Sequence, residues 1–212
     1  YGMVELPEGK MKSREGTVVD ADDLIEDMYS EAKATSEESG KLADMPEEER
    51  ERLYHMIGLG ALKYFILKVD PKKTMLFDPR ESIDFNGNTG PFIQYTHARI
   101  CSILRKAEAE GRKPELARDA ALNPKEVRLV QLLCSYPSKL QEAADNFSPA
   151  LLANYSYELA KEFNQYYHDT QILRESDPTL LSMRLELISQ IAGVLRAAMG
   201  LPARELHAPS QN

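Results

Sequence analysis

Apolar residues recur every three or four positions through most of the chain, which is the spacing of one face of an α-helix. The pattern is clearest over residues 150–169 and again over 179–199. Ser148-Pro149 precedes the first of these segments, and Gly200 follows the second, so each segment has a start or a stop signal. We therefore predict a long helix over each segment.

Helices are also predicted in the first half of the chain. An acidic cluster begins one over residues 20–34, and a proline begins another over 46–67, because both residue types favour the first turn of a helix. The polar stretch 35–44 has little pattern, and we interpret it as a connection. Gly58 and Gly60 lie inside the second helix, where each costs about 1 kcal/mol relative to alanine. Close packing against another element would explain both glycines.

A linker and two further helices are expected between residues 111 and 146. Residues 111–123 contain glycine and proline and lack a helical pattern, so they form the linker. Asn123-Pro124 then begins a helix that Pro137 should end, because an interior proline removes a hydrogen bond and clashes with the preceding turn. A shorter helix follows over 138–146. The face of the longer helix that we expect to point inward contains Val127, Val130, Leu133 and Cys134.

Extended segments are few. Residues 1–19 are typical of a strand, an exposed loop and a second extended segment, and residues 75–77 form a short extended piece. We place a domain boundary after this piece. The predicted fold class is therefore mainly α, with a small mixed, mostly helical segment over 1–85 and a helical bundle over 86–212.

Composition places the chain among ordinary globular proteins. Of its 212 residues, 42% are hydrophobic and 28% are charged, and no apolar run reaches the ~20 residues that span a bilayer. Two cysteines, Cys101 and Cys134, give no disulfide framework, so we expect reduced thiols, a cytoplasmic location and no membrane contact. His97 and Cys101 stand at i and i+4, but two ligands without a third predict no metal site.

Charge is distributed unevenly. The net charge of −8 argues against a general binder of polyanions such as DNA. Residues 99–139 nevertheless carry nine basic and five acidic side chains. An acidic body with a local basic segment suits a protein that holds one RNA in one register.

The stretch from Asn86 to Arg99 has the strongest candidate chemistry. Its glycines permit a tight turn, and Pro91 marks a helix start, because the amide that proline lacks would be unpaired there anyway. This helix should run to about residue 110. Phe92, Tyr95 and Arg99 then share one face, where two rings and a guanidinium can stack on bases and bind phosphate. The alternative is that both rings pack in the core and that Arg99 is solvated.

Several long segments resemble arginyl-tRNA synthetases. The run from Gly87 to Arg99 is similar to the signature at which the catalytic domain of this family joins its helical anticodon-binding domain, and the resemblance extends over nearly the whole chain. The segments that carry it are GKMKSREGTVV (9–19), LGALKYFIL (59–67), GNTGPFIQYTHAR (87–99) and LLANYSYELAKEFNQYY (151–167).

The pentapeptide at residues 10–14 resembles the KMSKS loop of class I synthetases, whose cations stabilise the pyrophosphate of ATP during amino-acid activation. Lys10 and Met11 match its first two places, whereas Ser13 stands where the family has its second lysine. Either Lys12 or Arg14 supplies that charge in this interpretation. Taken alone, the pentapeptide is more typical of a basic surface loop, and it is the following GTVV and acidic helix that favour the KMSKS-like interpretation.

The resemblance also implies a set of tRNA-binding residues: Phe92, Tyr95, Arg99, Asn164 and Tyr167. Aromatic and arginine side chains of the first helix are expected to contact the anticodon loop, and Asn164 and Tyr167 point away from the apolar stripe of a later helix. The aromatic residues that share this stripe, and that we expect to pack in the core, are Tyr155, Phe163 and Tyr166.

These features identify the chain as a C-terminal piece of arginine-tRNA ligase. The histidines are scattered, without the HIGH motif that the nucleotide-binding fold requires, so we expect the piece alone to be inactive in aminoacylation. The resemblance implies tRNA-Arg as a partner, with arginine, ATP and Mg²⁺ serving the intact, monomeric enzyme and no cofactor on the piece alone. The alternatives are a helical protein-interaction module and the anticodon-binding domain of a glycyl or cysteinyl enzyme.

Overall fold

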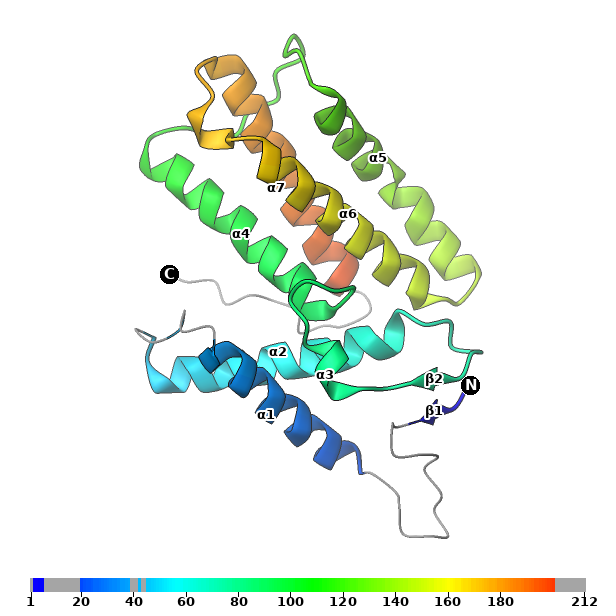
Figure 1. The fold of residues 1–212 in the computed structure, drawn as a ribbon. Helices are drawn as coiled ribbons and strands as arrows, with labels where there is room; N and C mark the ends of the chain where they lie inside the picture. The colour runs from blue at the N-terminus through cyan, green and yellow to red at the C-terminus, as the bar shows by residue number, and fades with distance from the viewer. Residues whose placement is uncertain (1, 6–19, 39–41, 43–44, 201–212) are drawn as a thin grey trace.

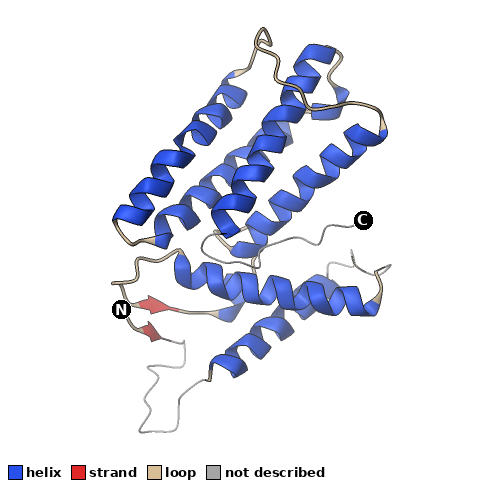
Figure 2. Ribbon diagram, turned by 180° about the vertical axis from the view of Figure 1, so that it is seen from behind, coloured by secondary structure: helices blue, strands red, loops and turns tan. Residues whose placement is uncertain are grey.

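The computed structural model describes residues 2–5, 20–38, 42 and 45–200, and nearly all of its regular structure is helical (Figures 1 and 2). Four long helices run side by side and antiparallel as a bundle, while two further helices form a layer across one of its ends. The bundle helices are α4 (Gly90–Ala109), α5 (Pro124–Asp145), α6 (Pro149–Asp169) and α7 (Pro178–Gly200). The other elements are β1 (Val4–Glu5), α1 (Ala21–Glu38), α2 (Glu47–Leu67), β2 (Met75–Leu76), α3 (Pro79–Ser82) and the 3₁₀ turn η1 (Ile172–Arg174).

The end layer has its own hydrophobic core. Helices α1 and α2 pack tightly, because a Cβ added to Gly58 would lie 2.7 Å from the carbonyl oxygen of Met28. The close packing that we predicted for Gly58 is therefore confirmed. Strands β1 and β2 pair in parallel, with Val4 opposite Met75. The buried residues of this core include Met28, Ala32, Ile57, Ala61, Phe77 and Ile83.

The bundle core is larger and draws on α4, α5, α6 and α7. Its fully buried side chains come from helix positions three and four apart, as the apolar periodicity predicted. Tyr155, Phe163 and Tyr166 are all buried, so their predicted packing role is confirmed. The central residues include Ile100, Leu129, Leu159, Leu185, Ile188 and Ile191.

Helix α2 is joined to the bundle by polar contacts around one tyrosine. The hydroxyl of Tyr64 lies 2.6 Å from Oδ1 of Asn88 and 3.1 Å from the carbonyl oxygen of Ala153. Lys68 donates to the carbonyl of Asn88 at 2.8 Å. A Cβ on Gly90 would lie 2.7 Å from the carbonyl oxygen of Gly60, so the absence of a side chain at Gly90 permits the backbones of α2 and α4 to approach.

Two helix boundaries differ from the sequence predictions. Residues 35–38 continue α1 instead of forming a connection. Pro137 lies inside α5 and does not end it, because packing of the whole helix against α6 and α7 outweighs the lost hydrogen bond. In the turn before Pro137, the carbonyl of Leu132 accepts hydroxyl hydrogen bonds from Ser135 at 2.7 Å and from Tyr155 at 2.9 Å.

The inward face of α5 was predicted only in part, because Val130 and Leu133 are partly buried and pack against the bundle core as expected. Val127 and Cys134 are exposed, whereas Leu129 and Leu132 point into the core. The buried carboxylate of Glu126 shares this inner face, and an acidic residue there hides the true apolar stripe from a hydropathy pattern. Among the described residues, no helix is long and apolar enough to cross a membrane.

Candidate nucleic-acid interface

The first turn of α4 is built as its sequence predicts. Thr89 is the N-cap, and its hydroxyl oxygen accepts a hydrogen bond from the amide of Phe92 at 3.3 Å. Pro91 occupies the first turn, where its missing amide costs nothing. This start sets the rotation of α4, so that Ile93 and Ile100 face the core while Tyr95 and Arg99 lie toward solvent.

Four of the predicted RNA-binding residues form one surface cluster, which we call the Arg99 cluster: Tyr95, Arg99, Asn164 and Tyr167. The guanidinium carbon of Arg99 lies 4.8 Å from the ring centroid of Tyr95 and 5.1 Å from that of Tyr167. Nη1 of Arg99 also donates a hydrogen bond to Oδ1 of Asn164. The two tyrosines remain 40% and 39% exposed, so the cluster presents aromatic surface to solvent.

Asn164 is the residue that orients this cluster. Its Nδ2 donates to Oγ1 of Thr96 at 2.7 Å and to the carbonyl of Ala160 at 2.9 Å. With the amide nitrogen committed to these acceptors, the amide oxygen is left to face Arg99. The guanidinium has five N–H donors, and a single amide oxygen leaves most of its hydrogen-bonding capacity for a ligand.

Phe92 does not join the Arg99 cluster. It is half-buried and packs on Tyr157, with 5.4 Å between the ring centroids. Both rings line an open groove of about 530 Å³ that follows α6, and this groove shares Asn164 with the Arg99 cluster. The groove is lined by Asn86, Phe92, Lys125, Tyr157, Lys161, Asn164, Gln165, His168 and Asp169.

Comparison with known families supplies the deciding observation. Residues 93–202 match the DALR anticodon binding domain, which is slightly more than half of the chain. The chain belongs to this family. The matched residues include α5, α6, α7 and all of α4 from its second turn, and therefore every residue of the Arg99 cluster.

The relatives of the whole chain are arginine-tRNA ligases, which confirms the resemblance seen in the sequence. The ligase of Parabacteroides distasonis is 56% identical over 203 residues, and that of Porphyromonas gingivalis is 53% identical over 208. These alignments cover 95% and 97% of the chain. The chain spans about one third of the length of these curated relatives, 34% and 35%.

Solved structures agree with this assignment. Arginyl-tRNA synthetase of Thermus thermophilus superimposes with a TM-score of 0.84 at 32% sequence identity, over 95% of this chain and 33% of that one. The synthetase of Plasmodium falciparum has a TM-score of 0.72 at 23% identity, again over 95% of this chain and 33% of the other, and shows the shared fold. The predicted fold class, a mainly α anticodon-binding domain, is confirmed.

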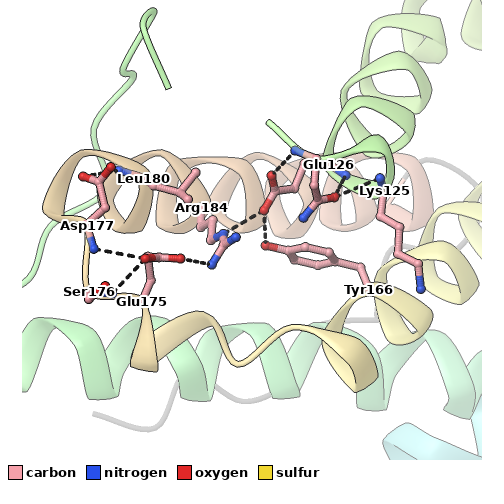
Figure 3. Close-up of polar contacts among 9 residues, drawn as sticks. Lys125, Glu126, Tyr166, Glu175, Ser176, Asp177, Leu180 and Arg184 are labelled. Atoms are coloured by element: carbon pink, nitrogen blue, oxygen red, sulfur yellow. Dashed lines mark hydrogen bonds and ion pairs between the residues drawn. The ribbon is translucent and has the colours of Figure 1, made fainter. Parts of the chain in front are cut away.

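A buried ionic network inside the anticodon-binding domain was missed by sequence reasoning (Figure 3). Glu126 is fully buried, and its Oε1 accepts hydrogen bonds from Nε of Arg184 at 2.7 Å and from the hydroxyl of Tyr166 at 3.0 Å. Nη1 of Arg184 donates to Oε2 of Glu175 at 2.6 Å. Burial, followed by the negative charge of Glu126, raises the pKa of Tyr166 well above its ordinary range.

The same network fixes the start of α5. Oε2 of Glu126 accepts from the backbone amide of Asn123 at 2.7 Å, while the Asn123 side chain accepts from the amides of Lys125 and Glu126. This reciprocal pair is a capping box, and Asn123 with Glu126 three positions later is the signal by which the sequence could have revealed it. Its link to Arg184 has no such local signal.

Two other groups of candidate residues do not belong to this interface as the structure describes it. The KMSKS-like residues Lys10, Met11, Lys12, Ser13 and Arg14 lie outside the described residues. His97 and Cys101 are neighbours on α4, with Sγ 3.8 Å from Nδ1. Within the described part of the chain, no group of three or more His, Cys, Asp or Glu side chains is arranged to hold a metal ion.

Proposed function

We propose that this chain is the anticodon-reading part of an arginine-tRNA ligase and that it binds the anticodon region of tRNA-Arg through the Arg99 cluster. The observation that supports this most directly is the guanidinium of Arg99, held between two half-exposed tyrosine rings and oriented by Asn164. Single-stranded RNA loops are recognised by this combination, because unstacked bases pack on aromatic rings while a guanidinium reaches base edges or phosphates.

Preorganisation gives the cluster its specificity. Arg99 has three contacts that restrict its rotamers before RNA arrives, so less side-chain entropy is lost on binding. Stacking of a base on Tyr95 or Tyr167 contributes about 1–3 kcal/mol and tolerates any base. The donors of Arg99 then discriminate among bases, because a planar fork pairs well only with acceptors in matching positions.

In the intact ligase, we propose that this module acts by positioning. Holding the anticodon end of the tRNA fixes where its acceptor end meets the activated arginine. The resulting high effective concentration of the acceptor end lowers the barrier to arginine transfer, and the module needs no acid–base groups for this. The loop at Lys10, Lys12 and Arg14 would serve a separate step, in which cations stabilise the pyrophosphate of ATP bound with Mg²⁺. By this division of labour, the chain alone does not aminoacylate tRNA.

The direct test is binding of the chain to tRNA-Arg and to an unrelated tRNA, measured by fluorescence anisotropy at several salt concentrations. We expect a preference for tRNA-Arg, and we expect Arg99→Ala to weaken that complex about ten-fold or more, in keeping with the loss of a base-reading arginine. Arg128→Ala is the control, because Arg128 makes an exposed bridge to Glu158 outside the Arg99 cluster. Equal binding of both tRNAs would rule out anticodon reading by this chain.

The two proposed roles separate in a complete ligase. Lys10→Ala should slow ATP–pyrophosphate exchange, while Arg99→Ala should leave that exchange nearly intact and slow transfer of arginine to tRNA. Loss of both activities in Arg99→Ala would instead assign Arg99 a folding role.

A further inference from the structure

The groove beside the Arg99 cluster has its own chemistry. Its floor is one face of α6, on which Tyr157, Lys161, Asn164 and His168 follow one another at three- and four-residue spacing. The helical rise of 1.5 Å per residue makes this face roughly 16 Å long. One end of the groove is aromatic, because Phe92 packs on Tyr157 there.

The other end of the groove is ionic. Lys125, in the first turn of α5, donates to the carboxylate of Asp169 at the end of α6, and the ring of His168 contacts the same carboxylate at 2.9 Å. Hydrogen bonds from His168 and then Lys125 hold the pKa of Asp169 below its ordinary value, so the carboxylate is charged near neutral pH. Asp169 therefore offsets much of the positive charge of Lys125.

Lys161 lies between these two ends and is exposed. Unlike Lys125, it makes no ion pair with any residue that the structure describes. Its ammonium consequently leaves the middle of the groove positive, next to the aromatic pair on one side and to Asn164 on the other. Asn164 also binds Arg99, so the groove and the Arg99 cluster adjoin at this residue.

We propose that this groove binds the sugar–phosphate backbone of the single-stranded RNA that continues from the Arg99 cluster, with Lys161 against a phosphate and the Phe92–Tyr157 pair against the neighbouring sugar or base. The proposal rests on the proposed function, because the strand is the one whose base is read at Arg99. In this arrangement Asp169 limits the affinity: it occupies Lys125 and repels the same backbone.

Two substitutions of opposite sign test the proposal in the full 212-residue chain with tRNA-Arg as the probe. Each phosphate contact with single-stranded RNA contributes about 0.7 to the slope of log affinity against log salt. Lys161→Gln should lower the slope by that amount, which weakens binding about eight-fold at 50 mM salt and about three-fold at 200 mM. Asp169→Asn should tighten binding and steepen the slope, because it frees Lys125.

The chain offers matched controls for both changes. Lys139→Gln removes a positive charge from α5 at a lysine paired with Glu142 and outside the groove. Glu158→Gln frees Arg128 just as Asp169→Asn frees Lys125. Both ion pairs join α5 to α6, and their side chains are about half exposed: 48% and 49% for Arg128 and Glu158, and 51% and 50% for Lys125 and Asp169. Both controls change the net charge by the same amount as their partners.

The outcomes separate the groove from the Arg99 cluster. The proposal is supported if Lys161→Gln weakens binding to tRNA-Arg and to an unrelated tRNA by similar factors, because a phosphate contact carries no sequence information. It is overturned if Lys161→Gln and Asp169→Asn behave like their controls while Arg99→Ala still abolishes the preference for tRNA-Arg. If the wild-type chain shows no preference for tRNA-Arg over the unrelated tRNA, that result counts against both proposals.

Discussion

Replacing Arg184 with methionine tests the buried network most sharply. The substitution keeps an unbranched apolar side chain in a site where Arg184 is only 12% exposed, and it removes the guanidinium that faces Glu126 and Glu175. Glu126 is fully buried and would keep only the hydroxyl of Tyr166 and the amide of Asn123 as donors. A buried carboxylate would thus lose its counter-charge.

The expected loss of unfolding free energy is about 3 kcal/mol, the lower end of the range for breaking one side of a buried ion pair. We take the lower end because two neutral donors to Glu126 remain. For a domain of this size, about 3 kcal/mol corresponds to a fall of roughly 6–12 °C in Tm. Adding Glu126→Gln to Arg184→Met should recover part of the loss, because a neutral amide needs no counter-charge.

Urea denaturation followed by circular dichroism measures these differences. Arg128→Met is the matched control, because it removes an arginine from a bridge whose two side chains are about half exposed, and we expect a change of at most about 1 kcal/mol. If Arg184→Met costs no more than Arg128→Met, or if the double variant is less stable than the single one, the network does not stabilise the bundle as described.

Two further predictions concern packing and pH. Gly58→Ala should lower the free energy of unfolding by about 1–3 kcal/mol, because its Cβ would meet the carbonyl of Met28. Gly193→Ala has open space around it and should raise the free energy of unfolding by up to about 1 kcal/mol. Thermal unfolding that shows the same sign for both variants would refute the close contact at Gly58. Burial raises the pKa of Tyr155 to about 12 from 10.0, so its stabilising contribution is complete below pH 10 and is lost as pH rises toward 12. Tyr155→Phe should reduce this fall in the free energy of unfolding between pH 10 and 12. If the dependence of the unfolding free energy on pH is the same in the variant and the wild type, the assignment to Tyr155 is refuted.

Local signals in the sequence predict most of what positions the Arg99 cluster. Thr89 and Pro91 mark the start of α4, and the start fixes the rotation that turns Arg99 outward. On α6, Tyr166 belongs to the apolar stripe, so its neighbour Tyr167 must point about 100° away and remain accessible. What periodicity does not contain is the distance between α4 and α6, and therefore the stacking of Arg99 between the two tyrosines.

Features that depend on long-range contacts escaped prediction for the same reason. Pro137 carries a strong helix-breaking signal, yet α5 continues because its packing on the bundle outweighs one lost hydrogen bond. Glu126 is typical of a solvated capping residue in its local context. Its burial follows only from Arg184, 58 positions later, which provides a counter-charge in the folded chain.

The buried network also bears on the proposed RNA-binding surface. Glu126 holds the first turn of α5 through the capping box and contacts α6 through Tyr166 and α7 through Arg184. Lys125 is the residue before Glu126 in that turn (Figure 3). The network therefore fixes where Lys125 leaves α5 and meets Asp169. A loss of Glu126 should therefore alter the ionic end of the groove as well as the stability of the bundle. If the proposed groove binds RNA, buried residues that do not touch the RNA would in this way determine how much positive charge it encounters.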